Sequence, residues 1–239
     1  MASRNAPPPI HITGLVKRRF QFMGREKRSS MLLVSIVLLF ILSPILENYA
    51  TGGLLLILNL YITLIAATSE LADKRALFWS AIPMAIASMI LVLATHYYHP
   101  WLLVFANYLV LAVFLALVSG SLFIYLGQKG KIAKDRILVS VSLYFLLGLT
   151  WFAIYNVINL VQPGSFAEAG KPLTGITHWS TMLYFSLVTL TTLGYGDIVA
   201  IKPAARMFAT LEAAAGVLYI AITVARLVAA QPSSKQGER

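Results

Sequence analysis

One stretch organises the whole chain: Thr189-Leu190-Thr191-Thr192-Leu193-Gly194-Tyr195-Gly196-Asp197. An apolar segment, His178 to Leu190, runs directly into it, and a long helical pattern, Pro203 to Ala230, follows it. Two glycines flank one tyrosine, and glycine takes the positive φ values that other residues avoid. A loop of this composition can aim successive carbonyl oxygens in one direction. We therefore expect residues 192–196 to act through their backbone carbonyls.

The composition indicates a membrane protein. The chain has 239 residues, of which 59% are hydrophobic and 12% are charged, whereas a soluble domain carries about 25% charged residues. There are no cysteines, which excludes a disulfide framework and cysteine-based metal or haem sites. The formal net charge is +10. In a membrane protein we interpret this charge as cationic flanks held against anionic lipid, and not as a nucleic-acid surface.

Six apolar segments approach or exceed the roughly 20 helical residues needed to cross the hydrocarbon core. The predicted spans are Met31–Asn48, Gly52–Thr68, Leu77–Thr95, Trp101–Leu126, Ile137–Val161 and Pro203–Ala230. Pro44 is expected to break the first span near its end. A seventh piece, His178–Thr191, is too short to cross and is predicted to be a re-entrant helix buried by surrounding protein. The predicted fold class is an all-α membrane protein with six transmembrane helices, one re-entrant pore helix and its loop.

Lysine and arginine in the short loops predict the orientation. Seven lie in residues 1–30, two in 69–76 and four in 127–136, whereas 47–51 and 96–100 have none. This alternation predicts that both termini are cytoplasmic and that the 161–202 connection lies outside. That connection includes residues 192–196, which we call the glycine loop. We expect a multi-pass protein of the cell membrane, that is, an inner or plasma membrane.

The basic N-terminal segment leaves two interpretations open. In residues 12–23, apolar and basic side chains alternate irregularly, so this part either lies in the lipid interface or is a plain basic flank. Either way, anionic membrane lipids are the expected partner. A signal peptide over residues 1–46 has less support, because the apolar run starts late and no small-residue cleavage site follows it.

Residues 181–228 resemble the pore module of bacterial potassium channels of the two-transmembrane "ion channel" superfamily. The matching residues are Tyr184-Phe185-Ser186, the stretch 189–197, Arg206, Leu211-Glu212, Gly216-Val217-Leu218-Tyr219 and Ala225-Arg226-Leu227-Val228. The segment Thr192–Gly196 differs from the TVGYG filter pattern only at Leu193. Residue 137 onwards fits the outer helix of that module by position.

This resemblance implies a potassium-selective channel, not an enzyme, that assembles as a homotetramer with one filter strand from each chain. It implies that the carbonyl oxygens of Thr192, Leu193, Gly194 and Tyr195 bind K⁺, with the Thr192 hydroxyl as the innermost ring. Gly196 completes the filter. No cofactor is expected beyond the K⁺ ions bound there.

The same resemblance assigns roles around the filter. The residues assigned to filter support are Asp197, Tyr184, Thr191 and Glu212. Tyr195 is expected to point away from the pore and to brace the filter against the re-entrant helix. The cavity below is expected to be lined by Val217, Ile220 and Val224. Val188 stands where some relatives have a glutamate that pairs with the filter aspartate, so that carboxylate pair is absent.

Two residues of the last span allow more than one interpretation. Glu212 is a carboxylate inside an apolar span, which makes it a functional candidate. It serves either as a structural polar brace or as a direct ion contact, and we favour the brace. Gly216 is either a gating hinge or a site of close helix packing through a small residue.

The predicted domains are a basic cytoplasmic segment (1–30), a four-helix transmembrane domain (31–126), a basic cytoplasmic linker (127–136), the pore domain (137–230) and a short cytoplasmic tail (231–239). The four-helix domain occupies the place of a voltage sensor, which needs arginines along its fourth span. Residues 77–127 contain no Lys, Arg, Asp or Glu. We therefore expect conduction with little or no intrinsic voltage sensing.

Alternatives to this interpretation have less support. His96, His99 and His178 lie near the predicted outer surface, where they either sense external pH or are ordinary interfacial residues. A coupled transporter with filter-like loops would usually repeat the span–loop–span unit four times in one chain, and one unit is present here. No pairing of catalytic carboxylates, metal ligands or nucleophile and histidine favours an enzyme.

Overall fold

The computed structural model describes residues 25–46, 49, 52–71, 75–98, 100–128, 134–174 and 179–229. The helices described are α2 (Arg25–Leu46), α3 (Gly52–Glu70), α4 (Arg75–Tyr97), α5 (Trp101–Gly127), α6 (Lys134–Val161), α7 (Trp179–Leu190) and α8 (Pro203–Ala229). The strands are β1 (Phe166–Glu168), β2 (Lys171–Pro172) and β3 (Ile198–Ala200). Six of these helices are long and apolar enough to cross a membrane, and α7 is shorter. The predicted helical multi-pass membrane fold is therefore confirmed.

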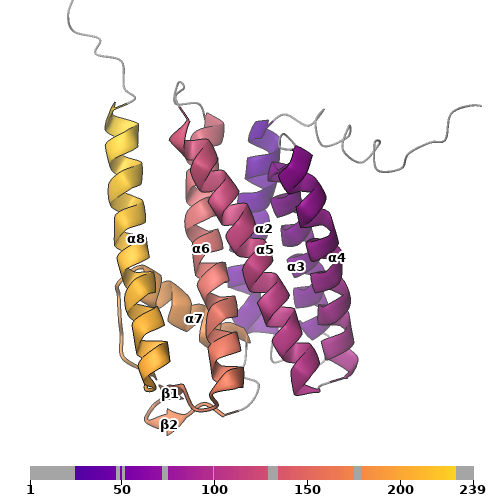
Figure 1. The fold of residues 1–239 in the computed structure, drawn as a ribbon, viewed down its shortest axis with the longest axis vertical. Helices are drawn as coiled ribbons and strands as arrows, with labels where there is room; N and C mark the ends of the chain where they lie inside the picture. Colours follow the sequence, from indigo (N-terminus) through magenta and orange to yellow (C-terminus); the bar gives the residue numbers. More distant parts are fainter. Residues whose placement is uncertain are drawn as a thin grey trace, which may run out of the picture.

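The helices form a bundle in which α6 is central (Figure 1). On one side, α5 and α2 pack against α6, and α3 and α4 complete a four-helix group with them. On the other side, α7 packs against both α6 and α8. The start of α2 and the end of α8 lie at the same end of the bundle, opposite β1 and β2 (Figure 1). The four-helix group thus packs on the α6–α8 unit of its own chain.

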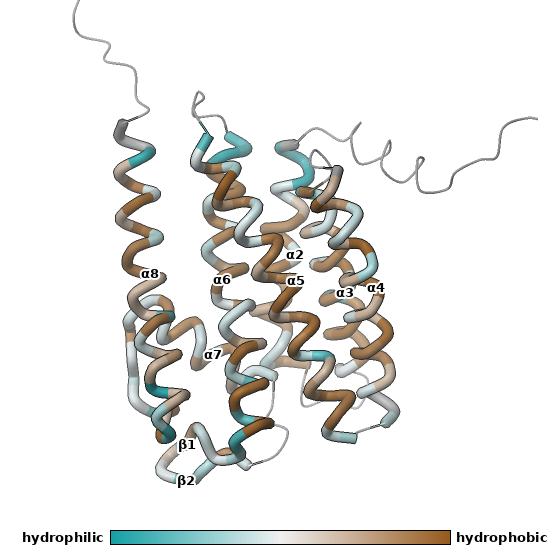
Figure 2. The backbone as a smooth tube through the Cα atoms, in the orientation of Figure 1, coloured by the Kyte–Doolittle hydropathy of each residue, from teal (hydrophilic) through white to brown (hydrophobic). Residues whose placement is uncertain are grey.

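Hydropathy follows this arrangement. Hydrophobic residues occupy the middle of α2 to α5, and hydrophilic residues gather where α2 begins and where α5 is followed by α6 (Figure 2). Many apolar side chains on the outside are exposed, among them Val34, Leu58 and Ile90. Such surfaces suit hydrocarbon, because lipid tails provide the apolar surroundings that water does not.

The first helix begins earlier than predicted. It begins at Arg25 and continues through Pro44 to Leu46, although Pro44 was expected to break it. Proline removes the amide that would bond to the carbonyl four residues earlier. That carbonyl, of Phe40, instead accepts a hydrogen bond from Ser43 Oγ at 3.3 Å. Since α2 starts early, Arg28 is buried, and its Nη1 donates to the carbonyl oxygen of Ser69 at 3.0 Å.

A small antiparallel sheet, in the order β2-β1-β3, was not predicted. Its strands are two or three residues long, too short for an alternating pattern to be visible in the sequence. The turn between β1 and β2 uses Ala169 and Gly170, with φ of 46° and 79°, as a two-residue hairpin requires. β3 pairs with β1 in the register Ala167↔Val199, which ties the chain after the glycine loop to the segment after α6.

Candidate functional site

The backbone of the glycine loop alternates in handedness. Thr192, Gly194 and Gly196 have φ of 58°, 55° and 81°, whereas Leu193 and Tyr195 between them have negative φ. In an ordinary strand successive carbonyl groups point to opposite sides, and left-handed residues at every second position turn them to one side. Thr192 is β-branched, so its positive φ is a true outlier that costs of order 1–3 kcal/mol. Strain of this kind is typical of functional sites.

The amides of the loop are turned back onto the C-terminal end of α7. The bonds run from Thr191 N to Leu187 O (3.0 Å), Thr192 N to Thr189 O (2.9 Å), Leu193 N to Val188 O (2.9 Å) and Gly194 N to Val188 O (3.4 Å). The Thr191 side chain adds a bond from Oγ1 to Leu187 O at 2.7 Å. Among the described residues, no donor bonds to the carbonyl oxygens of residues 192–196. These oxygens are therefore available to a ligand.

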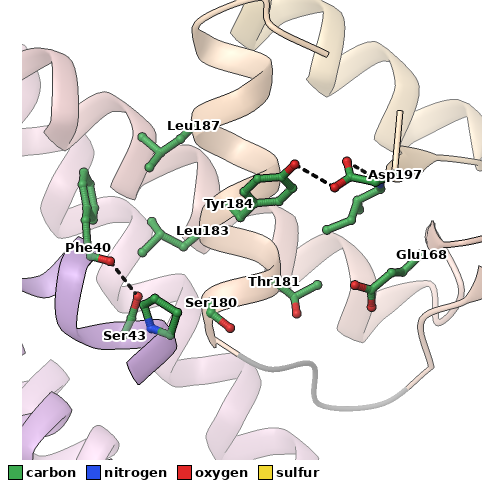
Figure 3. A pocket seen from close by; sticks show the side chains of 11 residues that line it. Phe40, Ser43, Glu168, Ser180, Thr181, Leu183, Tyr184, Leu187 and Asp197 are labelled. Carbon is green, nitrogen blue, oxygen red and sulfur yellow. Dashed lines mark hydrogen bonds between the residues drawn. The ribbon is translucent and has the colours of Figure 1, made fainter. Parts of the chain in front are cut away.

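Asp197 fixes the outer end of the loop. Its Oδ2 accepts a hydrogen bond from the Tyr184 hydroxyl at 2.7 Å, and its Oδ1 accepts one from the Ile198 amide at 3.0 Å (Figure 3). The carbonyl oxygen of Asp197 accepts a bond from the Ala169 amide at 3.0 Å. The Tyr184 bond is the main cause that lowers the pKa of the Asp197 carboxyl below its ordinary value. The predicted support residues Tyr184 and Asp197 are thus in direct contact.

Tyr195 is largely uncovered in the single chain. Its side chain is 68% exposed, and its hydroxyl makes no hydrogen bond within the described part of the chain. The expected brace against α7 is therefore not formed within one chain. Leu193, its neighbour, is 54% exposed. Because the tyrosine ring and the leucine side chain are this exposed, both are accessible to another chain.

Glu212 lies behind α7, completely buried. Ser186 Oγ of α7 lies 2.6 Å from Glu212 Oε1, and the hydroxyl of Tyr155 on α6 donates to Oε2. Ser186 Oγ also donates to the carbonyl oxygen of Gly148 on α6 at 2.7 Å. One carboxyl group thus joins α6, α7 and α8.

Sequence reasoning missed Tyr155 as a partner of Glu212. The two residues are 57 positions apart and lie on different helices, so their spacing carries no signal. The tyrosine ring is packed edge-on against Phe166 and Phe185, with centroid distances of 5.4 and 5.1 Å. This aromatic packing holds the hydroxyl against Glu212.

Gly216 marks a close approach of α8 to the end of α7. A Cβ at this position would lie 2.0 Å from the carbonyl oxygen of Leu190, far inside van der Waals contact. α8 runs without interruption through Gly216 from Pro203 to Ala229. The geometry requires glycine for packing whether or not the position also bends.

The predicted cavity residues share one uncovered face of α8. Val217, Ile220 and Val224 are 54%, 50% and 53% exposed, at spacings of three and four that keep them on one side of a helix. In the most apolar 18-residue stretch of each helix, 17% of α8 is buried, compared with 56% of α6. The α8 face and the glycine loop are thus left uncovered by the described part of this chain.

Some expectations fall outside the described residues. These are the basic segment up to residue 24, the linker residues 129–133, His99, His178 and the tail from residue 230. They stay predictions, as does the proposed role of His96. In the described part of the four-helix group, α5 carries no charged side chain.

Residues 137–230 match a family model described as "Ion channel". Over 81 residues the chain is 41% identical to the potassium voltage-gated channel protein shk-1 of Caenorhabditis elegans, which is 34% of this chain and 15% of that protein. It is 33% identical over 84 residues to the inward rectifier potassium channel Kirbac3.1 of Paramagnetospirillum magnetotacticum, covering 35% of this chain and 24% of that one. It is 36% identical over 80 residues to human potassium voltage-gated channel subfamily A member 4, covering 34% of this chain and 12% of that one.

The matched stretch spans less than a quarter of each of these relatives. No solved structure matches the chain. The family match begins in the first turn of α6 and extends to the end of α8. The segment that holds the glycine loop, Glu212 and Gly216 is therefore similar to the ion-channel family and to potassium channels from animals and a bacterium.

Proposed function

We propose that this protein is a potassium-selective channel that conducts K⁺ passively through a pore formed by four copies of the chain. The observation that carries the proposal is the loop backbone. Left-handed residues alternate along it, its amides bond back to α7, and its carbonyl oxygens accept no bond among the described residues. The similarity of residues 137–230 to ion channels supports the same function.

In this mechanism the protein replaces the water around a K⁺ ion with fixed oxygens. The carbonyl oxygens of Thr192, Leu193, Gly194 and Tyr195 form successive rings, and the Thr192 hydroxyl adds the innermost ring. One chain supplies one strand of such a ring, so a pore needs several copies. The C-terminal end of α7 points its partial negative charge toward the cation path.

The uncovered surfaces support assembly through the pore unit. In a tetramer, Leu193, Tyr195 and the exposed face of α8 would be covered by neighbouring copies or would face the ion path. Tyr195 would then find its brace on another chain, which the single chain does not provide. We propose Val217, Ile220 and Val224 as the lining of the cavity below the filter.

Glu212 acts in this proposal as a structural brace and not as an ion contact. Both carboxyl oxygens are engaged by hydroxyl groups of α6 and α7, and the side chain is completely buried. The brace holds the last helix against the helix that carries the filter. Tyr184 and Asp197 hold the outer end of the same filter.

Conduction is proposed to depend little on voltage, because α5 carries no charged side chain that could move in the membrane field. The protein is placed in the cell membrane with both termini cytoplasmic. Its basic N-terminal segment would then lie against anionic lipid.

The test is ion flux through the purified full-length protein in liposomes under opposing K⁺ and Na⁺ gradients. We expect the reversal potential to follow the K⁺ equilibrium potential. The variant Gly194→Ala places a side chain at a positive φ and should reduce flux strongly while the protein still assembles. Equal permeability to Na⁺ and K⁺ would contradict selectivity, and flux coupled to a second solute would indicate a transporter.

A further inference from the structure

A cavity of about 390 Å³ lies between α2 of the four-helix group and α7 beside the filter. Its volume is within the range of about 300–1,000 Å³ that is typical of small-molecule sites. The cavity is lined from α2, α7 and the strand segments β1 and β3. This space is the α2–α7 cavity.

The two ends of the cavity differ in chemistry. The apolar side chains of Phe40, Leu183 and Leu187 gather at one end, and the carboxylates of Glu168 and Asp197 lie at the other (Figure 3). None of the described lining residues carries a positive charge. Glu168 is exposed, and its carboxylate makes no hydrogen bond or ion pair within the described part of the chain. The cavity thus offers negative charge without a compensating cation from these residues.

We propose that the α2–α7 cavity binds a small amphipathic cation. Charge complementarity places an ammonium group at Glu168 and Asp197, and the apolar chain lies against Phe40, Leu183 and Leu187. A neutral or anionic molecule of the same shape lacks the contact with the carboxylates, so the site discriminates by charge. Charged groups arranged in this way provide specificity in addition to the affinity that apolar burial supplies.

Occupation of this cavity would affect the filter. Tyr184 also lines the cavity, and its hydroxyl donates the hydrogen bond that holds Asp197 at the end of the loop. A cation at Asp197 therefore contacts the same carboxylate that Tyr184 holds. The α2–α7 cavity is therefore a candidate regulatory site that connects the four-helix group with the loop.

The test measures binding without reference to conduction. The thermal midpoint of the purified full-length protein in micelles is recorded during titration with octylammonium, and separately with octanol and octanoate. We expect a saturable rise with octylammonium and no saturable rise with the other two. Glu168→Gln should weaken the apparent affinity about two- to fivefold, as expected for one partly solvated ion pair. Glu26→Gln, which removes an exposed carboxylate far from the cavity, is the matched control.

A second pair of variants tests the location. Ser43 lines the cavity from α2, so Ser43→Phe should fill it and abolish the saturable response. Ile41→Phe enlarges a side chain of the same helix that is 54% exposed, and it should leave the response unchanged. If Ser43→Phe does not fold, Glu168→Lys serves instead, because the exposed position tolerates the change and the reversed charge should repel the ligand.

Three results would overturn the proposal. These are equal responses to octylammonium and octanol, an unchanged affinity in both Glu168 variants, and no saturable binding to the assembled protein, which would mean that another chain fills the space. Any of them can occur while K⁺ flux stays selective. Conversely, a loss of the proposed channel function in liposomes leaves the binding result intact, so the two proposals fail separately.

Discussion

Glu212 on α8 and Ser186 on α7 approach each other to 2.6 Å in the centre of the α6–α8 unit. The contact lies behind the helix that leads into the loop, and Tyr155 completes it from α6. Because buried polar groups are costly when they lose their partners, the carboxyl group of Glu212 is one of the contacts that hold α8 against α6 and α7.

The first prediction concerns substitution of this group. Glu212→Gln keeps an oxygen that accepts from Tyr155 and provides an amide that donates to Ser186, so we expect selective K⁺ flux close to that of the unaltered protein. Glu212→Leu removes both contacts and leaves the buried hydroxyl of Tyr155 without this partner, at a cost of about 1–3 kcal/mol, whereas Ser186 keeps its bond to the carbonyl oxygen of Gly148. We expect a lower thermal midpoint and loss of assembled protein on size exclusion. If Glu212→Gln abolishes selectivity while assembly is normal, the brace interpretation is wrong.

The parts of this site that could be predicted are those whose residues are adjacent in the sequence. The loop was found because Gly194, Tyr195 and Gly196 are adjacent in sequence and their backbone requirement is a property of residue type. The partners of Glu212 were not found, because Tyr155 reaches it from another helix across 57 positions. A carboxylate in an apolar span indicates that a partner exists but does not identify it.

In the fold, too, features with a strong local sequence signal were predicted and features without one were missed. The long apolar segments identified six spans, because hydrophobicity over about 20 residues is a strong signal. The three short strands carry no such signal, so the hairpin that ties Asp197 to Ala169 was missed. Arg28 was assigned to the basic flank by its charge, yet it is 3% exposed because α2 starts at Arg25. Charge alone does not show whether a residue at a helix end faces solvent.

The second prediction concerns the outer end of the loop. Tyr184→Phe removes the hydroxyl that donates to Asp197 and should leave K⁺ selectivity in place while currents decline faster during sustained conduction. Tyr49→Phe, at a tyrosine that is 64% exposed, is the control and should have no effect. Single-channel or macroscopic recording in bilayers measures the decline. Identical time courses for Tyr184→Phe and the unaltered protein would show that the bond does not stabilise the loop.

The same bond predicts a direction for pH dependence. Since it lowers the pKa of Asp197, the carboxylate is charged and the bond is fully present above the ordinary carboxyl pKa of about 3.9. The stabilisation is lost only as pH falls through the lowered pKa. We therefore expect this site to leave thermal stability nearly unchanged between pH 7 and pH 5, and to lower it as pH falls below about 4. In Tyr184→Phe the pKa of Asp197 should move back toward its ordinary value, so the loss of thermal stability in acid should be smaller than in the unaltered protein.

The third prediction concerns voltage. Moving one elementary charge through 100 mV is worth about 2.3 kcal/mol, and the described length of α5 has no charged side chain to move. We expect an effective gating charge below about one elementary charge. Conductance against voltage in planar bilayers measures it. A gating charge of several elementary charges would contradict the prediction and would require a charge-bearing element other than α5.

The fourth prediction concerns the contact between α8 and the end of α7. Gly216→Ala would place its Cβ 2.0 Å from the carbonyl oxygen of Leu190, so α8 has to move away from α7. Overpacking of this kind costs about 1–3 kcal/mol or more, and the displaced backbone is the one from which the loop begins. We expect Gly216→Ala to reduce both the thermal midpoint and K⁺ flux. Gly120→Ala on α5 is the matched control, because a Cβ there meets no atom within 4 Å, and it should retain both. If Gly216→Ala kept full stability and changed only the open time, the position would act as a hinge and not through close packing.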